Sequence, residues 1–370
     1  MTIRLFELAR AHEELAGPIA AAIERVVASS SFILGAEVEQ FESEFAAYCG
    51  AGQCIGVGNG LDALFLILKA MGIGAGDEVI VPATTFAGAW LAVTRTGARP
   101  VPVQLDREPS EEQLDCLAKA ISSATRAVIV VHLYGLPQSL RLLRQLLDER
   151  GVPLIEDAAQ AHGALNHGER VGAASMACAF SFYPAKNLGA LGDGGAITTS
   201  NNALADTLIK LRNYGCEGKY NHVVPGFNTR LDEIQAAVLR AKLVVLDDWN
   251  ARRRQLAERY IAAFADLPLG IQMPHADSQS VWHQFVIRVD DRAALRSYLQ
   301  SLDIETGIHY PLACYRQPVF SAWLEPGLNF PAIDLYHEQV LSLPMGPHLL
   351  EAEQDRVIDA LRSWVERQAG

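Results

Sequence analysis

Short apolar runs alternate with amphipathic stretches along the first two thirds of the chain. The apolar runs predict strands at residues 54–57, 78–81, 99–103, 127–132, 152–156, 178–182 and 195–198. Apolar positions at helical spacing predict helices at residues 15–29 and 38–48 and between most of the strands. Strands and helices that alternate at such short intervals are typical of a largely parallel sheet with crossover helices.

The last third of the chain shows a different pattern. A long helical stretch covers residues 231 to about 264, and we interpret its middle, residues 243–249, as the crossing into a second domain. Beyond it the pattern predicts a strand at residues 283–289, a helix at 292–302, a strand at 306–310 and a closing helix at 351–367. The sequence thus predicts a large α/β domain, residues 1–245, and a smaller α+β domain, residues 246–370.

Length and charge limit the classes of function. A chain of 370 residues, half of them hydrophobic, is long enough to bury a large core in two domains. The net charge of −12 argues against binding to nucleic acid or to an anionic membrane, because phosphate groups attract a basic surface. Any anionic ligand must therefore be held by local donors.

Cysteine spacing and the first thirty residues indicate the cellular compartment of the protein. The six cysteines form no CxxC pair and no ligand spacing with histidine, so neither a zinc site nor a disulfide framework is indicated. Acidic residues interrupt the first thirty positions, which contain no apolar run long enough for a signal peptide or a membrane span. We expect a cytoplasmic protein with reduced thiols and no bound metal.

A lysine and a carboxylate follow two of the predicted strands. Lys186 lies in a turn of small residues after residues 178–182, and Asp157 ends the strand before it. In open α/β sheets, ligands bind beyond the carboxyl ends of the strands. A lysine amine there can condense with the aldehyde of pyridoxal phosphate, and a carboxylate can keep the pyridine nitrogen protonated. Gln160, three residues after Asp157, is placed to reach the ring hydroxyl.

The predicted site also offers donors for a phosphate and a wall for a ring. Residues 58–62, Gly-Asn-Gly-Leu-Asp, start an apolar helix and expose backbone N–H groups that the Ser181 hydroxyl can supplement. Asp62 is expected to face away from this phosphate cradle. Phe86 follows another strand and can stack on the ring opposite the lysine. His162 is compatible with the same site or with simple packing.

Basic and aromatic residues gather in one loop. Arg212, Lys219, Tyr220, Asn228 and Arg230 lie in or beside a stretch rich in glycine and asparagine. Such a loop is usually a solvated connection, but in an acidic chain it also offers counter-charge to a phosphate or diphosphate ligand.

As a set, seven motifs resemble the nucleotide-sugar aminotransferases of the DegT/DnrJ/EryC1/StrS family, from about Phe32 to the end of the chain. The motifs are residues 57–64, 76–82, 156–162, 181–187, 192–195, 212–215 and 228–232. The resemblance implies the architecture of a fold type I pyridoxal phosphate aminotransferase, with a mostly parallel seven-stranded sheet, a smaller C-terminal domain and a homodimer that shares its active sites.

The resemblance also implies roles for single residues. Lys186 is similar to the lysine that binds the cofactor aldehyde, Asp157 to the pyridinium partner and Gln160 to the contact with the ring hydroxyl. Phe86 is similar to the stacking aromatic residue, and Ser181 with the amides of Gly60 and Leu61 resembles the phosphate cradle. Asn228 resembles an asparagine that reaches the phosphate from the second subunit. Residues that resemble the sugar-nucleotide contacts are Tyr183, Lys219, Tyr220, His309 and Tyr310.

The function implied by the resemblance is transfer of an amino group from L-glutamate to a nucleotide-linked sugar. Many family members have Ser-Gly-Thr where this chain has Asn59-Gly60-Leu61, so one hydroxyl is missing from the cradle. That sequence and residues 307–311, Gly-Ile-His-Tyr-Pro, favour a dTDP-linked 3-keto-6-deoxyhexose over a 4-keto sugar. Three alternatives remain open: a C4 aminotransferase that acts on a nucleotide-linked 4-keto-6-deoxyhexose, a sugar dehydratase, which the presence of Lys186 disfavours, and a regulator that binds ligand without turnover.

Overall fold

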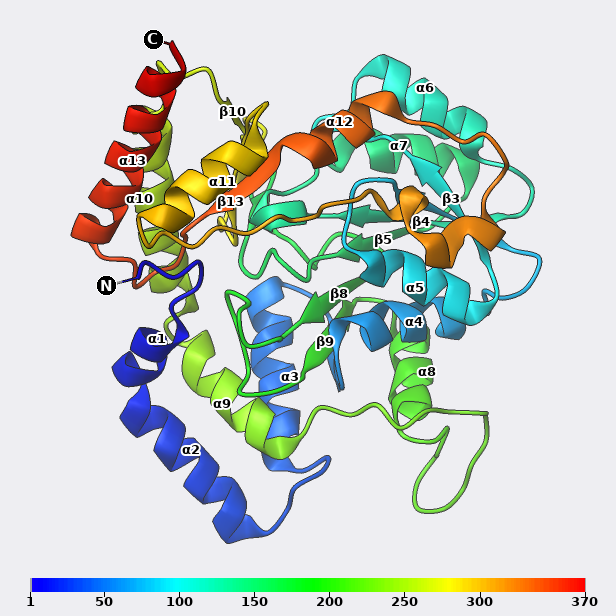
Figure 1. Cartoon of the computed structure of the whole chain (residues 1–370). Coiled ribbons are helices and arrows are strands. Elements are labelled where there is room, and N and C mark those ends of the chain that lie inside the picture. The colour runs from blue at the N-terminus through cyan, green and yellow to red at the C-terminus, as the bar shows by residue number, and fades with distance from the viewer. Residues whose placement is uncertain (1, 370) are drawn as a thin grey trace.

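The computed structural model describes residues 2–369 and shows a large α/β domain beside a smaller C-terminal one (Figure 1). The helices are α1 (Leu8–Glu14), α2 (Ala16–Ser29), α3 (Ala36–Cys49), α4 (Gly60–Ala70), α5 (Ala87–Thr96), α6 (Glu111–Ala120), α7 (Arg141–Arg150), α8 (Asn202–Arg212), α9 (Glu233–Leu243), α10 (Leu246–Ala263), α11 (Arg292–Ser301), α12 (Pro331–Gln339) and α13 (Glu351–Ala369).

A seven-stranded sheet forms the centre of the large domain. Its strands, in spatial order, are β1 (Gln53–Val57), β9 (Gly195–Thr199), β8 (Ala177–Ser181), β5 (Leu154–Asp157), β4 (Thr125–Val131), β2 (Glu78–Pro82) and β3 (Arg99–Val103). Strand β9 runs antiparallel to both of its neighbours, and the other pairs are parallel. The carboxyl ends of β2, β3, β4, β5 and β8 therefore lie along one edge of the sheet.

Burial on both faces explains why these strands read as continuous apolar runs. Helices pack on the two sides of the sheet, so alternate side chains of one strand enter different cores. In β4, Ala127 and Ile129 pack with α4 and α5, whereas Val128 and Val130 pack with α6 and α7. Helix α4 is buried over most of its surface, which matches its uninterrupted apolar sequence.

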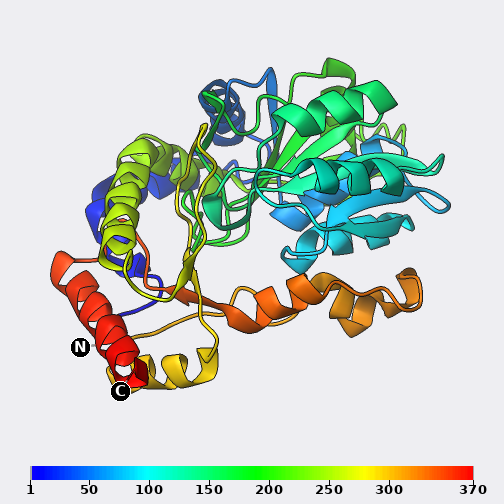
Figure 2. The same cartoon turned by 90° about the horizontal axis from the view of Figure 1, so that it is seen from above.

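The C-terminal domain is built on a three-stranded antiparallel sheet of β10 (Gly270–Ile271), β12 (Phe285–Arg288) and β13 (Val340–Leu343). Helices α10, α11 and α13 supply the rest of its core. Ile3 also packs into this core and forms a bridge with Ile304, so the N-terminus of the chain lies beside the C-terminal helices (Figures 1 and 2). A third, small sheet joins β11 (Ser278–Gln279), β6 (Leu165–Asn166) and β7 (Glu169–Arg170).

The predicted fold class is confirmed, and each of the seven predicted strands of the large domain overlaps an observed strand. The long helical stretch breaks at Val244 and Val245, inside the predicted crossing. The division at residues 245 and 246 stays a prediction. Among residues 2–369, no helix is both long and apolar enough to cross a membrane.

The strand predicted at residues 306–310 is wrong. Only Gly307 pairs with the neighbouring strand, through an isolated bridge to Ser342. Beyond Gly307 the chain leaves the ladder, and the backbone carbonyl of His309 is bonded to a side chain instead. Its Nδ1 lies 2.8 Å from Ser342 Oγ, and its carbonyl accepts a hydrogen bond from the Tyr134 hydroxyl.

Candidate active site

Asp157 is the last residue of β5 and is almost fully buried. Its Oδ1 accepts a hydrogen bond of 3.1 Å from the amide of Ala159. Burial raises the pKa of this carboxyl group above its ordinary value, although the Ala159 amide and the positive charge of Lys186 act in the opposite direction. The site therefore holds a carboxylate that is stabilised by any added cationic group, such as a protonated pyridine ring.

Lys186 lies in a tight turn that follows β8. The amide of Lys186 donates to the Tyr183 carbonyl at 2.8 Å, and the amide of Ala190 closes the turn on the Phe182 carbonyl at 2.8 Å. Gly189 is required here, because a Cβ atom at this position would lie 2.3 Å from the carbonyl oxygen of Pro184. Burial lowers the pKa of Lys186 to about 8, against the opposing effect of Asp157. Its amine is thus much more nucleophilic near neutral pH than that of a solvated lysine.

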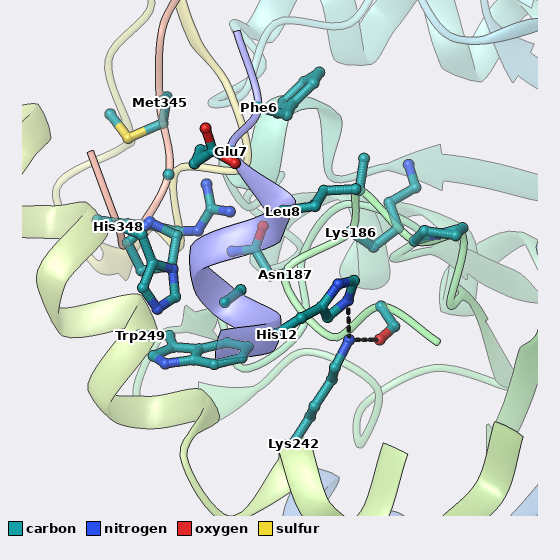
Figure 3. Close-up of a pocket in the computed structure, with 17 residues that line it drawn as sticks. Phe6, Glu7, Leu8, His12, Lys186, Asn187, Lys242, Trp249, Met345 and His348 are labelled. Atoms are coloured by element: carbon teal, nitrogen blue, oxygen red, sulfur yellow. Dashed lines mark hydrogen bonds between the residues drawn. The ribbon is translucent and has the colours of Figure 1, made fainter. Parts of the chain in front are cut away.

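A buried lysine from a helix supports this turn from behind. Lys242 of α9 donates a hydrogen bond of 2.7 Å to the carbonyl of Gly189, and its Nζ lies 3.5 Å from Nε2 of His12 in α1 (Figure 3). Burial lowers the pKa of Lys242 to about 8 as well. Figure 3 shows the amine of Lys186 pointing away from this contact. Lys242 therefore faces the backbone of the turn, whereas Lys186 faces the site.

Asn187 fixes the same turn from the side. Its Nδ2 donates to Oδ1 of Asn250 and to the carbonyl of Val281, both at 2.9 Å, and its Oδ1 lies 3.1 Å from Nδ1 of His283. Asn187, Asn250 and His283 are all buried. Because a buried amide with satisfied partners has one preferred orientation, this network limits where the neighbouring Lys186 can lie.

Tyr134, just beyond β4, organises the opposite side of the site. Its amide donates to Oε1 of Gln160 at 2.5 Å, and Nε2 of Gln160 contacts the Tyr310 hydroxyl at 3.2 Å. The ring of Tyr310 lies 5.4 Å from the ring of Phe86, centroid to centroid. His309 is half-buried, and burial together with the charge of Lys186 lowers its pKa to about 4. His309 is therefore neutral at physiological pH.

The start of α4 provides the phosphate cradle. Asn59 caps the helix by accepting a hydrogen bond of 2.8 Å from the amide of Asp62, which leaves the first amides of the helix, those of Gly60 and Leu61, without intrahelical acceptors. Gly60 approaches Ser181 so closely that a Cβ atom would lie 2.7 Å from the Ser181 Cβ. The carboxylate of Asp62 bonds to Arg95 at 2.7 Å and to the Thr229 hydroxyl at 2.8 Å, which agrees with its predicted orientation away from the cradle.

The structure thus brings together Lys186, Asp157, Gln160, Ser181 and the amino end of α4 at one edge of the sheet. Free amides at a helix start suit a phosphate, a buried carboxylate suits a protonated ring nitrogen, and a lysine of lowered pKa suits an aldehyde. Phe86 keeps 55% of its surface exposed, which is consistent with a ring face that a planar ligand can cover. These residues fit pyridoxal phosphate.

Three of the predicted ligand contacts, Lys219, Tyr220 and Asn228, lie away from this cluster of residues. Lys219 and Tyr220 are in the exposed loop between α8 and α9, which extends away from the sheet (Figure 1), and Tyr220 is 82% exposed. Asn228 is also exposed, at the base of that loop. His162 packs against the rings of Phe180 and Phe182, with centroids 5.5 and 5.7 Å away, which supports the packing interpretation.

Sequence reasoning gave no role to the residues that support the site. They are Tyr134, Lys242, Asn250 and His283. A signal existed for Tyr134 alone, because it follows a predicted strand on the same sheet edge as Asp157. The other three come from segments whose contact with the turn depends on tertiary packing.

Comparisons with known proteins agree with this geometry. Residues 14–362 match the model of the DegT/DnrJ/EryC1/StrS aminotransferase family. The chain is 49% identical over 370 residues to dTDP-3-amino-3,4,6-trideoxy-alpha-D-glucose transaminase of Streptomyces venezuelae, covering 99% of this chain and 97% of that relative.

Solved structures give the same result. S. venezuelae DesV, in complex with a ketimine intermediate, superposes with a TM-score of 0.95 at 48% identity over 99% of both chains. NtdA from Bacillus subtilis with bound cofactor PMP gives a TM-score of 0.87 at 30% identity and covers 95% of this chain and 82% of that one. The chain belongs to the DegT/DnrJ/EryC1/StrS aminotransferase family.

Proposed function

We propose that this chain transfers an amino group from L-glutamate to a dTDP-linked 3-keto-6-deoxyhexose and so forms a 3-amino-3,6-dideoxyhexose nucleotide. The observation that carries the proposal is the juxtaposition of Lys186, whose pKa is lowered to about 8, with the buried carboxylate of Asp157. The preference for carbon 3 is supported by the 49% identity to a transaminase of a dTDP-3-amino sugar.

The cofactor is pyridoxal 5′-phosphate, which alternates with the pyridoxamine form during amino transfer. When bound, it withdraws electrons from the carbon that carries the amino group, and this makes the proton on that carbon removable. Lys186 would hold the aldehyde carbon, Asp157 the ring nitrogen and Gln160 the ring hydroxyl. Ser181 and the amides of Gly60 and Leu61 would hold the phosphate, and Phe86 would cover one face of the ring.

The remaining chemistry falls to side chains of this protein. When it is not bonded to the cofactor, Lys186 would be a free amine, and its lowered pKa would let it accept and return a proton near neutral pH. Asp157 keeps its negative charge best when a cation faces it, so it favours the protonated ring. The turn that Lys242 and Asn187 hold would fix the position of this amine beside the cofactor.

For the sugar nucleotide we propose Tyr183, His309 and Tyr310 as contacts from the same chain. Tyr183 is 57% exposed beside the Lys186 turn, and Tyr310 touches both Gln160 and Phe86. Lys219, Tyr220 and Asn228 lie in or next to a protruding loop, so we propose that they complete the site of a second copy in a homodimer. We place the reaction in the cytoplasm, where the six free cysteines of the chain stay reduced.

The proposal is tested with purified holoenzyme, L-glutamate and two substrates, a dTDP-linked 3-keto and a dTDP-linked 4-keto 6-deoxyhexose. Mass spectrometry of the product should show an oxo group exchanged for an amine with the 3-keto sugar, together with 2-oxoglutarate. Amination of the 4-keto sugar alone would move the reaction to carbon 4. Loss of water without nitrogen gain would indicate a dehydratase, and binding without turnover of any keto sugar would indicate a regulator.

A further inference from the structure

A cavity of about 390 Å³ opens at the carboxyl ends of β2, β3 and β4. It lies outside the set of residues assigned to the cofactor. One wall is formed by the strand ends, including Pro82, Val103 and Val131, and the other by α12 of the C-terminal domain. Figures 1 and 2 show the orange segment that contains α12 running alongside the large domain. The volume is in the range of pockets that bind small molecules.

Two guanidinium groups line this cavity, those of Arg107 and Arg288. Arg107 donates to Oε1 of Gln272 at 3.1 Å and more weakly to the carbonyl of Met273 at 3.4 Å. Arg288 donates to Oε1 of Gln339 at 3.0 and 2.5 Å. Within residues 2–369, neither arginine forms an ion pair with a carboxylate. Asp106 is the one carboxylate that lines the cavity, and it is exposed.

Arg107 and Arg288 are hydrogen-bonded only to neutral oxygens, so both guanidinium groups can still accept an anionic partner. Guanidinium groups make their strongest contacts with carboxylate or phosphate oxygens, often two at a time. Burial lowers the pKa of Arg107, so an anion beside it would relieve an unfavourable charge. Tyr336 lies near both cations, with the Arg288 guanidinium 5.7 Å from its ring centroid.

The cavity is connected to the cofactor site by hydrogen bonds. The Tyr336 hydroxyl donates to the Tyr134 hydroxyl at 3.2 Å, and Tyr134 in turn donates to the carbonyl of His309. The amide of the same Tyr134 holds Gln160. Tyr134 is fully buried, so a shift of Tyr336 would be transmitted to residues on the cofactor side.

We propose that this cavity binds a small organic dianion, a dicarboxylate or a phosphate monoester, between Arg107 and Arg288. The apolar strand ends would take the carbon skeleton and the two guanidinium groups the negative charges. The bound anion shifts Tyr336 and, through it, Tyr134. This changes the positions of Gln160 and His309 and therefore the affinity of the site for its cofactor. Anion binding and cofactor release are both measured without turnover. The test of this proposal is therefore independent of the test of the proposed reaction.

Titration calorimetry on the pyridoxal phosphate holoenzyme tests the binding. The probes are succinate for dicarboxylates, which lacks the keto group of the proposed reaction product, and glycerol 3-phosphate for phosphate monoesters, with glycerol as the uncharged comparison. We expect one saturable site per chain for at least one dianion and none for glycerol. Arg107→Met and Arg288→Met should each weaken it about 10- to 150-fold, the loss expected for a hydrogen bond between charged groups.

The matched control is Arg126→Met, which removes the same charge at the amino end of β4, where Arg126 pairs with Asp77 at 2.8 Å. It should leave the affinity unchanged. Should Arg107→Met fold poorly, since it also anchors Gln272, Arg288→Met carries the test. Dianion binding that is equally strong in both variants, or absent from the wild type, would overturn the proposal.

Coupling is read from the rate at which cofactor leaves the holoenzyme, followed by its visible absorbance. The dianion should change this rate in the wild type. In Tyr336→Phe, which lacks the hydroxyl that contacts Tyr134, the anion should still bind but the change should be lost. An unaltered effect in this variant would refute the Tyr336–Tyr134 connection.

Discussion

Two lysines on either side of one turn, Lys242, which is buried, and Lys186, which is half-buried, differ in what they face. Both have a pKa lowered to about 8 by burial, but Lys242 donates to the backbone carbonyl of Gly189, whereas Lys186 has the Asp157 carboxylate as its main charged neighbour. The lowered pKa alone does not show which of the two lysines binds the cofactor. Geometry does, because only Lys186 lies on the same edge of the sheet as Asp157, Gln160 and the phosphate cradle.

The pKa of Lys186 predicts how the apo protein captures pyridoxal phosphate as pH changes. Only the neutral amine attacks the aldehyde, so the capture rate should rise with pH and level off once the pH exceeds about 8. Stopped-flow absorbance over a pH series measures this rate, with free lysine in the same buffers as the comparison. A rise only near the ordinary lysine pKa of 10.5 would contradict the burial described for Lys186.

Replacement of Asp157 tests the ring-nitrogen contact. Asp157→Asn keeps the shape but removes the buried charge, so amino transfer from L-glutamate should lose about 2–5 kcal/mol of transition-state stabilisation. Single-turnover absorbance measures the loss, while the cofactor should still attach to Lys186. The control Asp77→Asn, at the opposite edge of the sheet, should change the rate little. Equal rates for wild type and Asp157→Asn would show that the carboxylate does not act on the ring.

At the scale of elements, the turn after β8 depends on the absence of a side chain at Gly189. Gly189→Ala would place a Cβ atom 2.3 Å from the Pro184 carbonyl and force the turn open, at a cost of about 1–3 kcal/mol. Denaturant unfolding measures the stability, and equilibrium binding measures the affinity for cofactor, which should also fall. Gly192→Ala, in the same loop, meets only the end of the Gln235 side chain at 3.3 Å and should be tolerated. Equal behaviour of the two variants would contradict the strain assigned to Gly189.

Elements were predictable from the sequence where local pattern and tertiary role agree. Strands buried on both faces, such as β2 and β5, are continuous apolar runs with clear ends, and Lys186 and Asp157 could be placed because each follows such a run. Residues 306–310 alternate like a strand, yet the backbone at His309 is bonded to Tyr134 instead of a ladder. The contacts of Lys242 and Asn250 with the turn join positions far apart in sequence, which no local pattern records.

At the scale of the whole molecule, the exposed loop between α8 and α9 predicts active sites shared between two copies. Lys186→Ala and the double variant Lys219→Ala/Asn228→Ala should each be inactive or strongly impaired alone. Mixed after reversible dissociation, they should regain part of the activity, because one hybrid site combines an intact lysine with an intact loop. Light scattering should show a dimer. A monomer with full activity, or no recovery in the mixture, would contradict the shared site.

The division into residues 1–245 and 246–370 remains our proposal for how the chain is organised. The packing of Ile3 into the C-terminal core, and the contact between His12 and Lys242, connect the N-terminal segment to both parts. With this division, the contacts of Tyr310 with Gln160 and of His309 with Tyr134 join the second part to the first.

The most direct test of the account is to reduce the holoenzyme with borohydride, which fixes any cofactor bonded to a lysine, and to locate it by peptide mass spectrometry. We predict that the reduced cofactor is found on the peptide that contains Lys186 and that Lys186→Ala yields no modified peptide. Attachment to Lys242 or another lysine, or no covalent cofactor in the wild type, would contradict it.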